Sequence, residues 1–354
     1  MTQELALRDF RPQSMLRRPA HPVERPAFPA IDAHNHLGIE PFAGDWPARS
    51  AAELGATLDE AGVERIVDLD GFGGDRLRRE IERWQLGLPG RVAVYAGLDY
   101  EAWQTDEHFG ETEAARLRDS VGAGAHGLKV WKLLGLRARD PRGRLVTVDD
   151  PRLDPVWAAA AELEITVTIH IADPIAFFEP LDATNERWEE LHEHPDWHFW
   201  PRQASADSDG FPSFDELIEG LESLLERHSA TTFIGAHVGC AAEDLDEVSS
   251  MLERHPNFHC DIAARLGELG RQPYSARAFF LRYADRILFG VDMGPDPDLY
   301  ALHYRFLETL DESFDYDVEG PPSQGRWQIH GLGLPPDVLE KVYRTNALRL
   351  IRWE

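Results

Sequence analysis

Eight short runs of apolar, largely β-branched residues recur along the chain, and a stretch with helical character separates most of them from the next. The runs occupy residues 30–37, 64–70, 91–99, 126–133, 164–172, 231–239, 257–264 and 286–292. They are nearly continuous in apolar character, which is typical of strands buried on both faces of a parallel sheet that helices cover. Eight such units over roughly 260 residues predict an α/β fold, a (β/α)8 TIM barrel, in preference to a doubly wound sheet.

Three intervening stretches carry the end signals of helices. Residues 50–62 begin with Ser50, which can cap a helix, and end with Gly62. Residues 150–164 start with Asp-Pro, and residues 213–228 repeat leucine at helical spacing with acids at their start. No glycine fingerprint of the GxGxxG type opens a helix after the first run, which argues against a dinucleotide-binding fold.

The remaining segments lie outside this repeating pattern. Residues 1–29 contain five prolines and no sustained period, so they predict an extended arm ahead of one barrel domain over residues 30–354. Two connections, residues 173–212 and 293–335, are too long for ordinary turns. They follow the fifth and eighth runs, and we expect lid-like insertions at the C-terminal face of the barrel, where active sites lie.

The composition narrows the classes of partner. The chain has 63 acidic against 36 basic residues, a formal net charge of −27. Such a surface repels phosphate backbones and anionic membranes, so we expect no nucleic-acid and no membrane partner. No run of 18 apolar residues occurs, the N-terminus lacks the apolar stretch of a signal peptide, and two cysteines are too few for a disulfide framework. We expect a cytoplasmic homo-oligomer that acts on a small molecule.

The strongest local signal is the segment Asp32-Ala33-His34-Asn35-His36 in the first run. Residues two apart on a strand project to the same face, so Asp32, His34 and His36 point together into the barrel near its top. Two imidazoles that converge there can both reach one divalent ion. Two histidines alone are more often core residues whose hydrogen bonds are satisfied than metal ligands, so further ligands are needed to support a metal site.

Three more polar residues lie near the ends of later runs. They are His170 in the fifth (VTIHIADP), His237 in the sixth (FIGAHVG) and Asp292 in the eighth (ILFGVDMG). A barrel gathers catalytic groups from the ends of different strands, and buried His and Asp cost free energy unless they are paired or bound to metal. Three imidazoles, one carboxylate and a water form an open catalytic site suited to Zn²⁺, with Mn²⁺ or Fe²⁺ as alternatives.

This combination of motifs resembles the amidohydrolase superfamily. The closer likeness is to its amidohydrolase-related branch, which includes the aminocarboxymuconate-semialdehyde and hydroxybenzoate decarboxylases alongside lactone and amide hydrolases. The resemblance spans about residues 28–351, because the C-terminal VYRTNALRLI is also similar to the ending of that branch. The motifs are specific as a set, whereas the range of substrates in the branch is wide.

The resemblance implies a role for each motif residue. The metal ligands would be His34, His36, His170 and Asp292. His237 would be the acid/base that touches the water or the substrate, and an alternative gives Asp292 the role of general base. We expect Asp32 and Asp261 to accept hydrogen bonds that orient a ligand histidine or neighbouring backbone.

Two lysines, Lys129 and Lys132, lie in the fourth run. In binuclear members of the superfamily a carboxylated lysine at the end of this strand bridges two metals, which leaves a second metal as an alternative here. Because the two lysines are three residues apart, they point to opposite faces, and Trp131 shares the face of Lys129. We expect one metal, with one of these lysines and Trp131 in contact with the substrate.

Two other residues complete the predicted substrate pocket. Arg265 follows the seventh run and can bind a substrate carboxylate in a bidentate manner, although an ion pair with one of the many acids of the chain is an equal alternative. Trp200 belongs to the aromatic first insertion, and we expect it to line the pocket. The alternative for these aromatic residues is packing of the insertion onto the barrel rim.

Together these features predict a mononuclear metal-dependent hydrolase, in which a metal-activated water attacks an ester, lactone or amide bond of a small carboxylated substrate. The first alternative is non-hydrolytic decarboxylation of an aromatic or enolic acid at the same metal. The second is a barrel that binds a metal or metabolite without turnover. The amino-acid sequence leaves the choice among these three open.

Overall fold

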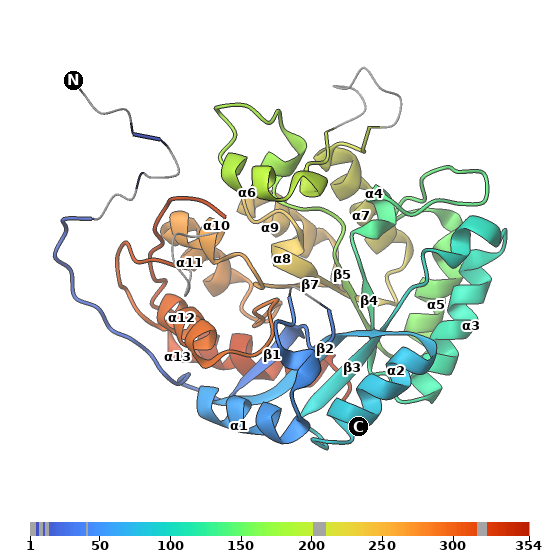
Figure 1. Cartoon of the computed structure of the whole chain (residues 1–354), viewed down its shortest axis with the longest axis horizontal. Helices are drawn as coiled ribbons and strands as arrows, with labels where there is room; N and C mark the ends of the chain where they lie inside the picture. The colour runs from blue at the N-terminus through green and yellow to red at the C-terminus, as the bar shows by residue number, and fades with distance from the viewer. Residues whose placement is uncertain are drawn as a thin grey trace.

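Eight parallel strands form one sheet in the order β1 to β8 (Figure 1). The computed structural model describes residues 5–6, 10, 14–39, 42–200, 210–316 and 324–353. The strands are β1 (Ala30–Asn35), β2 (Val63–Phe72), β3 (Val92–Gly97), β4 (Gly127–Val130), β5 (Thr166–Ile169), β6 (Thr232–Gly235), β7 (Phe258–Asp261) and β8 (Ile287–Leu288). The Ala33 N–H donates to the Phe289 carbonyl oxygen at 2.9 Å, which joins the last strand region to the first. The prediction of a (β/α)8 barrel is confirmed.

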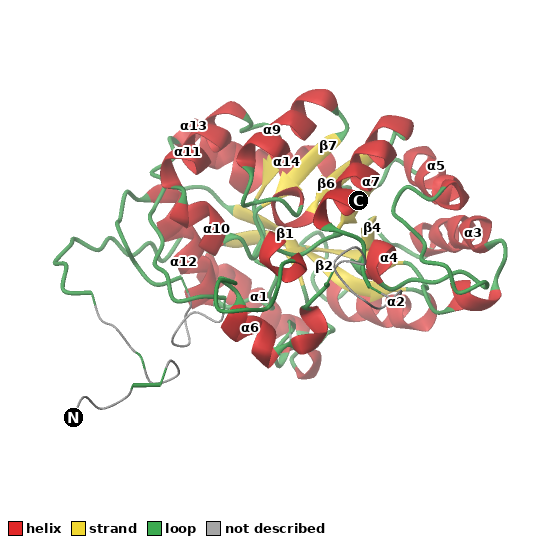
Figure 2. Cartoon of the chain, turned by 90° about the horizontal axis from the view of Figure 1, so that it is seen from above, coloured by secondary structure: helices red, strands yellow, loops and turns green. Residues whose placement is uncertain are grey.

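Most of the helices surround the strands on the outside of the barrel (Figure 2). Those of the first half are α1 (Ala51–Ala61), α2 (Gly74–Glu80), α3 (Phe109–Gly122), α4 (Leu133–Leu136), α5 (Asp154–Glu162), α6 (Trp188–Glu193) and α7 (Phe214–Arg227). Those of the second half are α8 (Ala236–Gly239), α9 (Leu245–Arg254), α10 (Leu266–Arg271), α11 (Pro273–Arg282), α12 (Pro297–Glu308), α13 (Pro336–Glu340) and α14 (Asn346–Leu350).

Two of the three expected helix starts are present as predicted, whereas Asp150 caps a short 3-10 turn (Pro151–Leu153) and α5 begins only at Asp154. Ser50 and Glu53 form a reciprocal capping box at the start of α1, and Gly62 ends that helix in the left-handed region with φ 75°. Ser213 and Glu216 form the same box at the start of α7. Each cap satisfies backbone N–H groups that a helix leaves unpaired, and such a cap stabilises by about 1 kcal/mol.

The core has two parts, as expected for a sheet that is buried on both faces. The larger part fills the space between the strands and the surrounding helices. The smaller part includes apolar side chains of alternate strand positions, with residues near the C-terminus packed against them. Its members are Ile31, Ala33, Val67, Leu69, Ala93, Tyr95, Ile234, Leu288, Ala347 and Ile351. The barrel is therefore a packed core and not a pore.

Several strands end earlier than the apolar runs suggest. The paired part of β6 ends at Gly235 and that of β8 at Leu288, so His237 and Asp292 both lie beyond the ladder. Their φ angles are 58° and 70°, in the left-handed region that non-glycine residues rarely adopt. These backbone turns redirect the side chains at the C-terminal end of the barrel, where strain is often found at functional sites.

The arm and the insertions lie outside the repeating units. Figure 1 shows the described part of the arm passing beside α12 before the chain enters β1, and Ala27 N–H donates there to the Glu308 carboxylate at 2.9 Å. The first insertion contains α6, and the second contains the three-turn helix α12. Among the described residues, no helix combines the length and apolar character that a membrane span requires.

Candidate metal centre

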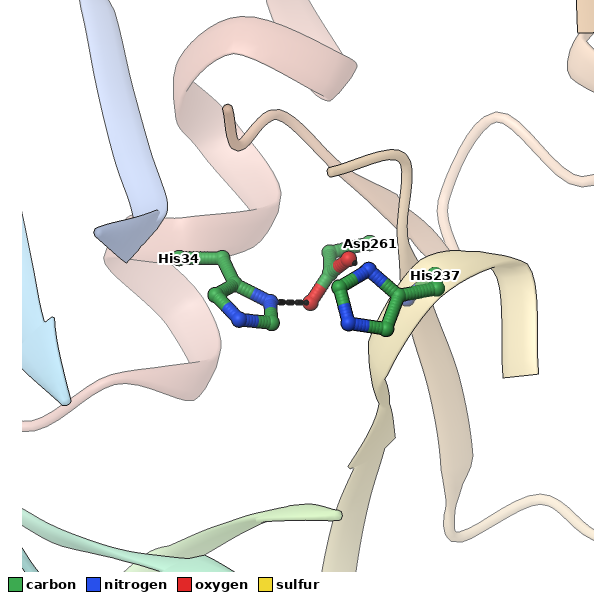
Figure 3. Close-up of side chains that lie close together, drawn as sticks. All are labelled: His34, His237 and Asp261. Atoms are coloured by element: carbon green, nitrogen blue, oxygen red, sulfur yellow. Dashed lines mark hydrogen bonds and ion pairs between the residues drawn. The ribbon is translucent and has the colours of Figure 1, made fainter. Parts of the chain in front are cut away.

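The two histidines of β1 are held by carboxylates from other strands. His34 Nδ1–H donates to Asp261 on β7 at 2.8 Å, as Figure 3 shows, and His36 Nδ1–H donates to Asp70 on β2 at 2.7 Å. When either ring is neutral, the carboxylate that accepts from Nδ1–H leaves the lone pair on Nε2. Both rings are buried. The network therefore turns the Nε2 atoms of both rings toward a common region, where they could bind a cation.

Asp292 brings a carboxylate to the same two atoms. Its Oδ1 lies 2.9 Å from His34 Nε2 and 3.2 Å from His36 Nε2. Three lone-pair donors cannot satisfy one another unless an imidazole is protonated, whereas one divalent cation satisfies all three. The Asp292 side chain is 16% exposed while the two imidazoles are nearly inaccessible, so the open side of the group is at Asp292. The donor set fits a cation such as Zn²⁺ with an accessible position.

The charges around these residues agree with that reading. Burial opposes protonation of His36, but Asp70 and Asp292 outweigh it and raise the pKa of His36 to about 9. Burial also opposes ionisation of Asp292, yet the neighbouring imidazoles of His237 and His34 hold its pKa well below its usual range. Asp292 is thus an ionised ligand at neutral pH. The raised pKa of His36 reflects the excess negative charge that a bound cation would neutralise.

Figure 3 shows the ring of His237 beside His34 and Asp261. The backbone N–H of His237 donates to Asp261 at 2.9 Å, and its ring Nδ1–H donates to the Ala263 carbonyl oxygen at 2.8 Å. The ring Nε2 therefore carries a lone pair. That Nε2 lies 4.0 Å from Asp292 Oδ2. Burial lowers the pKa of His237 well below its usual value. His237 is therefore a neutral imidazole within reach of a group bound at Asp292.

The carboxylate of Asp261 connects the two histidines. One oxygen accepts from His34 Nδ1, and the other accepts from the backbone N–H groups of His237 and Ala263 at 2.9 and 3.1 Å. His34, His237 and Asp261 also form a compact group of potential ligand atoms. Because three donors already occupy the oxygens of Asp261, we interpret this residue as an orienting group.

The structure does not bring His170 into the three-donor group. Its Nε2–H donates to the Ala172 carbonyl oxygen at 3.1 Å, which leaves Nδ1 with the lone pair. Its ring is T-shaped against His237, with centroids 4.4 Å apart. Burial lowers the pKa of His170 to about 4, so the ring is neutral. His170 lies beside the centre, but within the described part of the chain it belongs to neither group of converging ligand atoms.

The two lysines of the fourth run have different surroundings. Lys129 lies in β4, is fully buried, and places Nζ 3.2 Å from His34 Nε2 and 5.1 Å from the Trp131 ring centroid. Trp131 in turn lies beside His36, with ring centroids 5.2 Å apart. Lys132 instead forms an ion pair with Asp173 at 2.5 Å. Lys129 is thus the lysine that faces the centre, and burial lowers its pKa.

The other predicted site residues lie farther from the three donors. Asp32 accepts from the His34 N–H at 3.1 Å and from the Tyr300 hydroxyl at 2.7 Å, so it fixes the backbone at the end of β1. Arg265 is buried, donates to the Ala264 carbonyl oxygen and contributes to the low pKa of His237. Trp200 is half-buried in the first insertion. Its ring lies beside His198, with centroids 5.9 Å apart.

Two important residues were not predicted. Asp70, which orients His36, ends the second apolar run, so an acid at a strand end was the available signal. Gly290 lies so close to His34 that a Cβ atom there would be 2.8 Å from the His34 Cβ. No local pattern marks such a contact, because it joins β1 to the segment after β8.

Comparison with known proteins agrees with this geometry. The family model described as amidohydrolase matches residues 31–353. Comparison with curated proteins gives no match. The chain is similar in fold to a TIM-barrel protein from Bordetella bronchiseptica, with 15% identity, TM-score 0.54, and coverage of 91% of this chain and 97% of that one.

Two other solved structures are similar in fold. The 2,6-dihydroxybenzoate decarboxylase from Rhizobium has 17% identity, TM-score 0.53, and coverage of 91% and 98%. An amidohydrolase from Burkholderia multivorans with bound zinc has 14% identity, TM-score 0.50, and coverage of 91% and 98%. At these identities the structures support the fold, and the family model supports the assignment. The chain belongs to the amidohydrolase family and is an enzyme of the amidohydrolase superfamily.

Proposed function

We propose that this enzyme is a mononuclear metal-dependent hydrolase that cleaves an ester, lactone or amide bond of a small carboxylated molecule. The observation that carries the proposal is the convergence of His34 Nε2, His36 Nε2 and Asp292 Oδ1, with the open side at Asp292. His34, His36 and Asp292 would hold a divalent ion there, for which zinc is the best match, and such an ion would polarise a carbonyl group and acidify water. We propose His170, through Nδ1, as a further ligand after a small movement of its ring.

The acid/base role falls to His237. Its Nε2 carries a lone pair and lies 4.0 Å from Asp292 Oδ2, so it can accept a proton from a nucleophile held at Asp292. The hydrogen bond from Nδ1–H to Ala263 fixes the tautomer and stabilises the imidazolium that forms. The same Nε2–H then donates to the leaving oxygen or nitrogen. Asp292 remains ionised throughout because its pKa is low.

Local cations support a carboxylated substrate. The formal charge of −27 disfavours anionic substrates over the surface as a whole. Buried Arg265, next to His237, and buried Lys129, next to His34, supply positive charge close to the centre. We propose that one of these two cations pairs with a carboxylate of the substrate, while the carbonyl group of the cleaved bond lies at the metal-facing groups.

A decarboxylase of an aromatic or enolic acid is the second candidate. Its support is the similarity in fold to 2,6-dihydroxybenzoate decarboxylase. The same residues suit that reaction, because Arg265 would hold the carboxylate and protonated His237 would donate to the carbon that loses carbon dioxide. The two candidates differ in whether water enters the product.

One experiment separates them. The zinc-loaded enzyme is incubated in ¹⁸O-labelled water with a panel of carboxylated lactones, esters and amides and with 2,6-dihydroxybenzoate. We expect ¹⁸O in the product and no carbon dioxide, and a loss of about 10²–10⁴-fold in kcat for His237→Gln with unchanged zinc content. Carbon dioxide without ¹⁸O incorporation contradicts hydrolysis, and two zinc ions per chain by elemental analysis contradict the mononuclear site.

A further inference from the structure

A cavity of about 740 Å³ lies beside the metal centre, between helices α1 and α12 and the loops that follow β1, β7 and β8. Apolar side chains form much of its wall, among them Phe42, Trp46, Leu266, Met293 and Leu299. None of the metal-facing side chains lines it, although Val291 and Met293 flank Asp292 on either side. Its volume lies in the range of small-molecule sites, and its wall adjoins the metal centre at Phe42, whose ring centroid lies 5.6 Å from that of His36.

The charged residues of the cavity are mostly acidic. Among the residues that line it, Asp45, Glu60 and Asp296 carry negative charge and Arg49 carries positive charge. Arg49 forms an ion pair with Asp45 at 2.9 Å, so the charges of Glu60 and Asp296 remain without a cationic partner in the wall. Both of these residues are exposed to solvent. The mouth of the cavity therefore attracts cations and repels carboxylates.

One wall residue has an unsatisfied polar atom. His303 on α12 is buried and donates its Nδ1–H to the Leu299 carbonyl oxygen at 2.8 Å. Its Nε2 is buried and has no hydrogen-bond partner among the described residues. Burial lowers the pKa of His303 to about 4, so Nε2 is an acceptor at neutral pH. A buried acceptor without a partner is unusual, and a donor that reaches it gains a hydrogen bond.

We propose that this cavity is a second ligand site, which binds a small organic cation with an apolar or aromatic body and a hydroxyl or N–H donor at its other end. The apolar wall receives the body, the acids at the mouth attract the cationic group, and His303 Nε2 accepts from the donor. The charge preference is opposite to the one proposed for the metal centre. The ligand of this cavity is therefore a different molecule from the carboxylated substrate.

Three probes of one size test the charge and the donor separately. Tyramine has both the cation and the hydroxyl, phenethylamine lacks the hydroxyl, and 4-hydroxyphenylacetate replaces the cation with a carboxylate. Titration calorimetry on the full chain, before and after metal removal, measures each affinity. We expect tyramine to bind about tenfold more tightly than phenethylamine, because of the extra hydrogen bond, and more tightly still than 4-hydroxyphenylacetate.

Variants locate the binding in this cavity. Glu60→Lys reverses one charge at the mouth, and we expect it to weaken the binding of tyramine severalfold, with a smaller effect at high salt. The control Glu219→Lys makes the same change at an exposed position of α7 and should leave the binding of tyramine unchanged. His303→Phe keeps an aromatic ring but removes the acceptor, so tyramine and phenethylamine should bind this variant with equal affinity. Circular dichroism and urea unfolding check that each variant folds.

Three results would overturn the proposal. The first is 4-hydroxyphenylacetate binding as tightly as tyramine. The second is tyramine affinity that is unchanged in both Glu60→Lys and His303→Phe. The third is tyramine binding that disappears when the metal is removed, which would assign the probe to the metal centre. Failure of the proposed hydrolysis would leave each of these measurements unaffected, so the two proposals fail independently.

Discussion

Replacing Asp70 with Asn tests whether the carboxylate behind His36 controls metal binding. One oxygen of Asp70 accepts from His36 Nδ1–H, and the other accepts from the backbone N–H groups of Gly38 and Ile39 at 2.7 and 2.9 Å. Because both oxygens accept, the amide NH2 group of Asn must face a donor in either orientation. If it faces His36 Nδ1, the imidazole proton moves to Nε2 and the lone pair that binds the metal is lost.

The size of the effect follows from the role of the hydrogen bond. Loss of a group that orients a metal ligand costs about 10–100-fold in metal affinity, or roughly 1.4–2.8 kcal/mol. A competition titration of Zn²⁺ between the protein and a fluorescent chelator measures this directly. We expect Asp70→Asn to bind zinc at least tenfold more weakly than the parent protein at the same pH.

Asp68→Asn is the matched control for this experiment. Asp68 is buried on the same strand, but one oxygen accepts from the backbone N–H groups of Leu37 and Asp70, and among the described residues no imidazole forms a hydrogen bond with it. Burial raises the pKa of Asp68 well above its usual value, so a neutral amide resembles the acid already present. A zinc affinity of Asp70→Asn within twofold of the parent, or an equal loss in both variants, would refute the reasoning.

Other predictions concern stability. Burial outweighs the attraction of Arg187 and raises the pKa of Glu190 to about 7. Because the folded state therefore binds the proton more tightly than the unfolded state, stability is lost as the pH rises from about 4.5 through 7. Urea unfolding measures the free energy of unfolding at pH 5.5 and at pH 8. We expect its decrease between the two to be smaller in Glu190→Gln than in the parent protein, by on the order of 1–3 kcal/mol, and an identical decrease in both proteins would contradict this. Gly290→Ala places a Cβ atom against His34 and should cost about 1–3 kcal/mol in urea unfolding together with weaker zinc binding. An unchanged unfolding midpoint would exclude that contact. Zinc at 100 times its Kd should stabilise the fold by about 2.7 kcal/mol, and calorimetry with a chelator should reverse the rise in Tm. A Tm that does not respond to zinc or chelator would argue against a bound ion.

The fold was predictable because its signals are local. The apolar runs give the strands, and residues such as Ser50 and Glu53 give the helix starts through their own hydrogen bonds. The points at which strands leave the ladder were not predictable. The sequence around His237 and Asp292 remains apolar and strand-like, while the backbone there turns to positive φ. That turn is imposed by tertiary contacts, which a local pattern does not record.

Part of the candidate site was also predictable from the sequence. The spacing of His34 and His36 and the ends of the later runs identified most polar groups of the centre. The partner of His36 was not identified, because it depends on the pairing of β1 with β2, in which Asn35 lies opposite Asp68. His170 lies outside the three-donor group, and its Nε2–H donates to the backbone carbonyl oxygen of Ala172. A carbonyl oxygen two residues away leaves no mark in the pattern of side chains.

The two insertions of the barrel are tied to each other and to the seventh unit. Arg187 of the first insertion is buried with Glu190 and with Glu268 of α10, and its neighbour Glu189 pairs with Arg326 of the second insertion. Exchange of the first insertion with that of a relative would remove Arg187 and leave Glu268 of α10 buried without its cationic partner, and a buried unpaired charge is strongly destabilising. Changes in substrate range that replace the first insertion, in evolution or by engineering, therefore require a compensating change in α10.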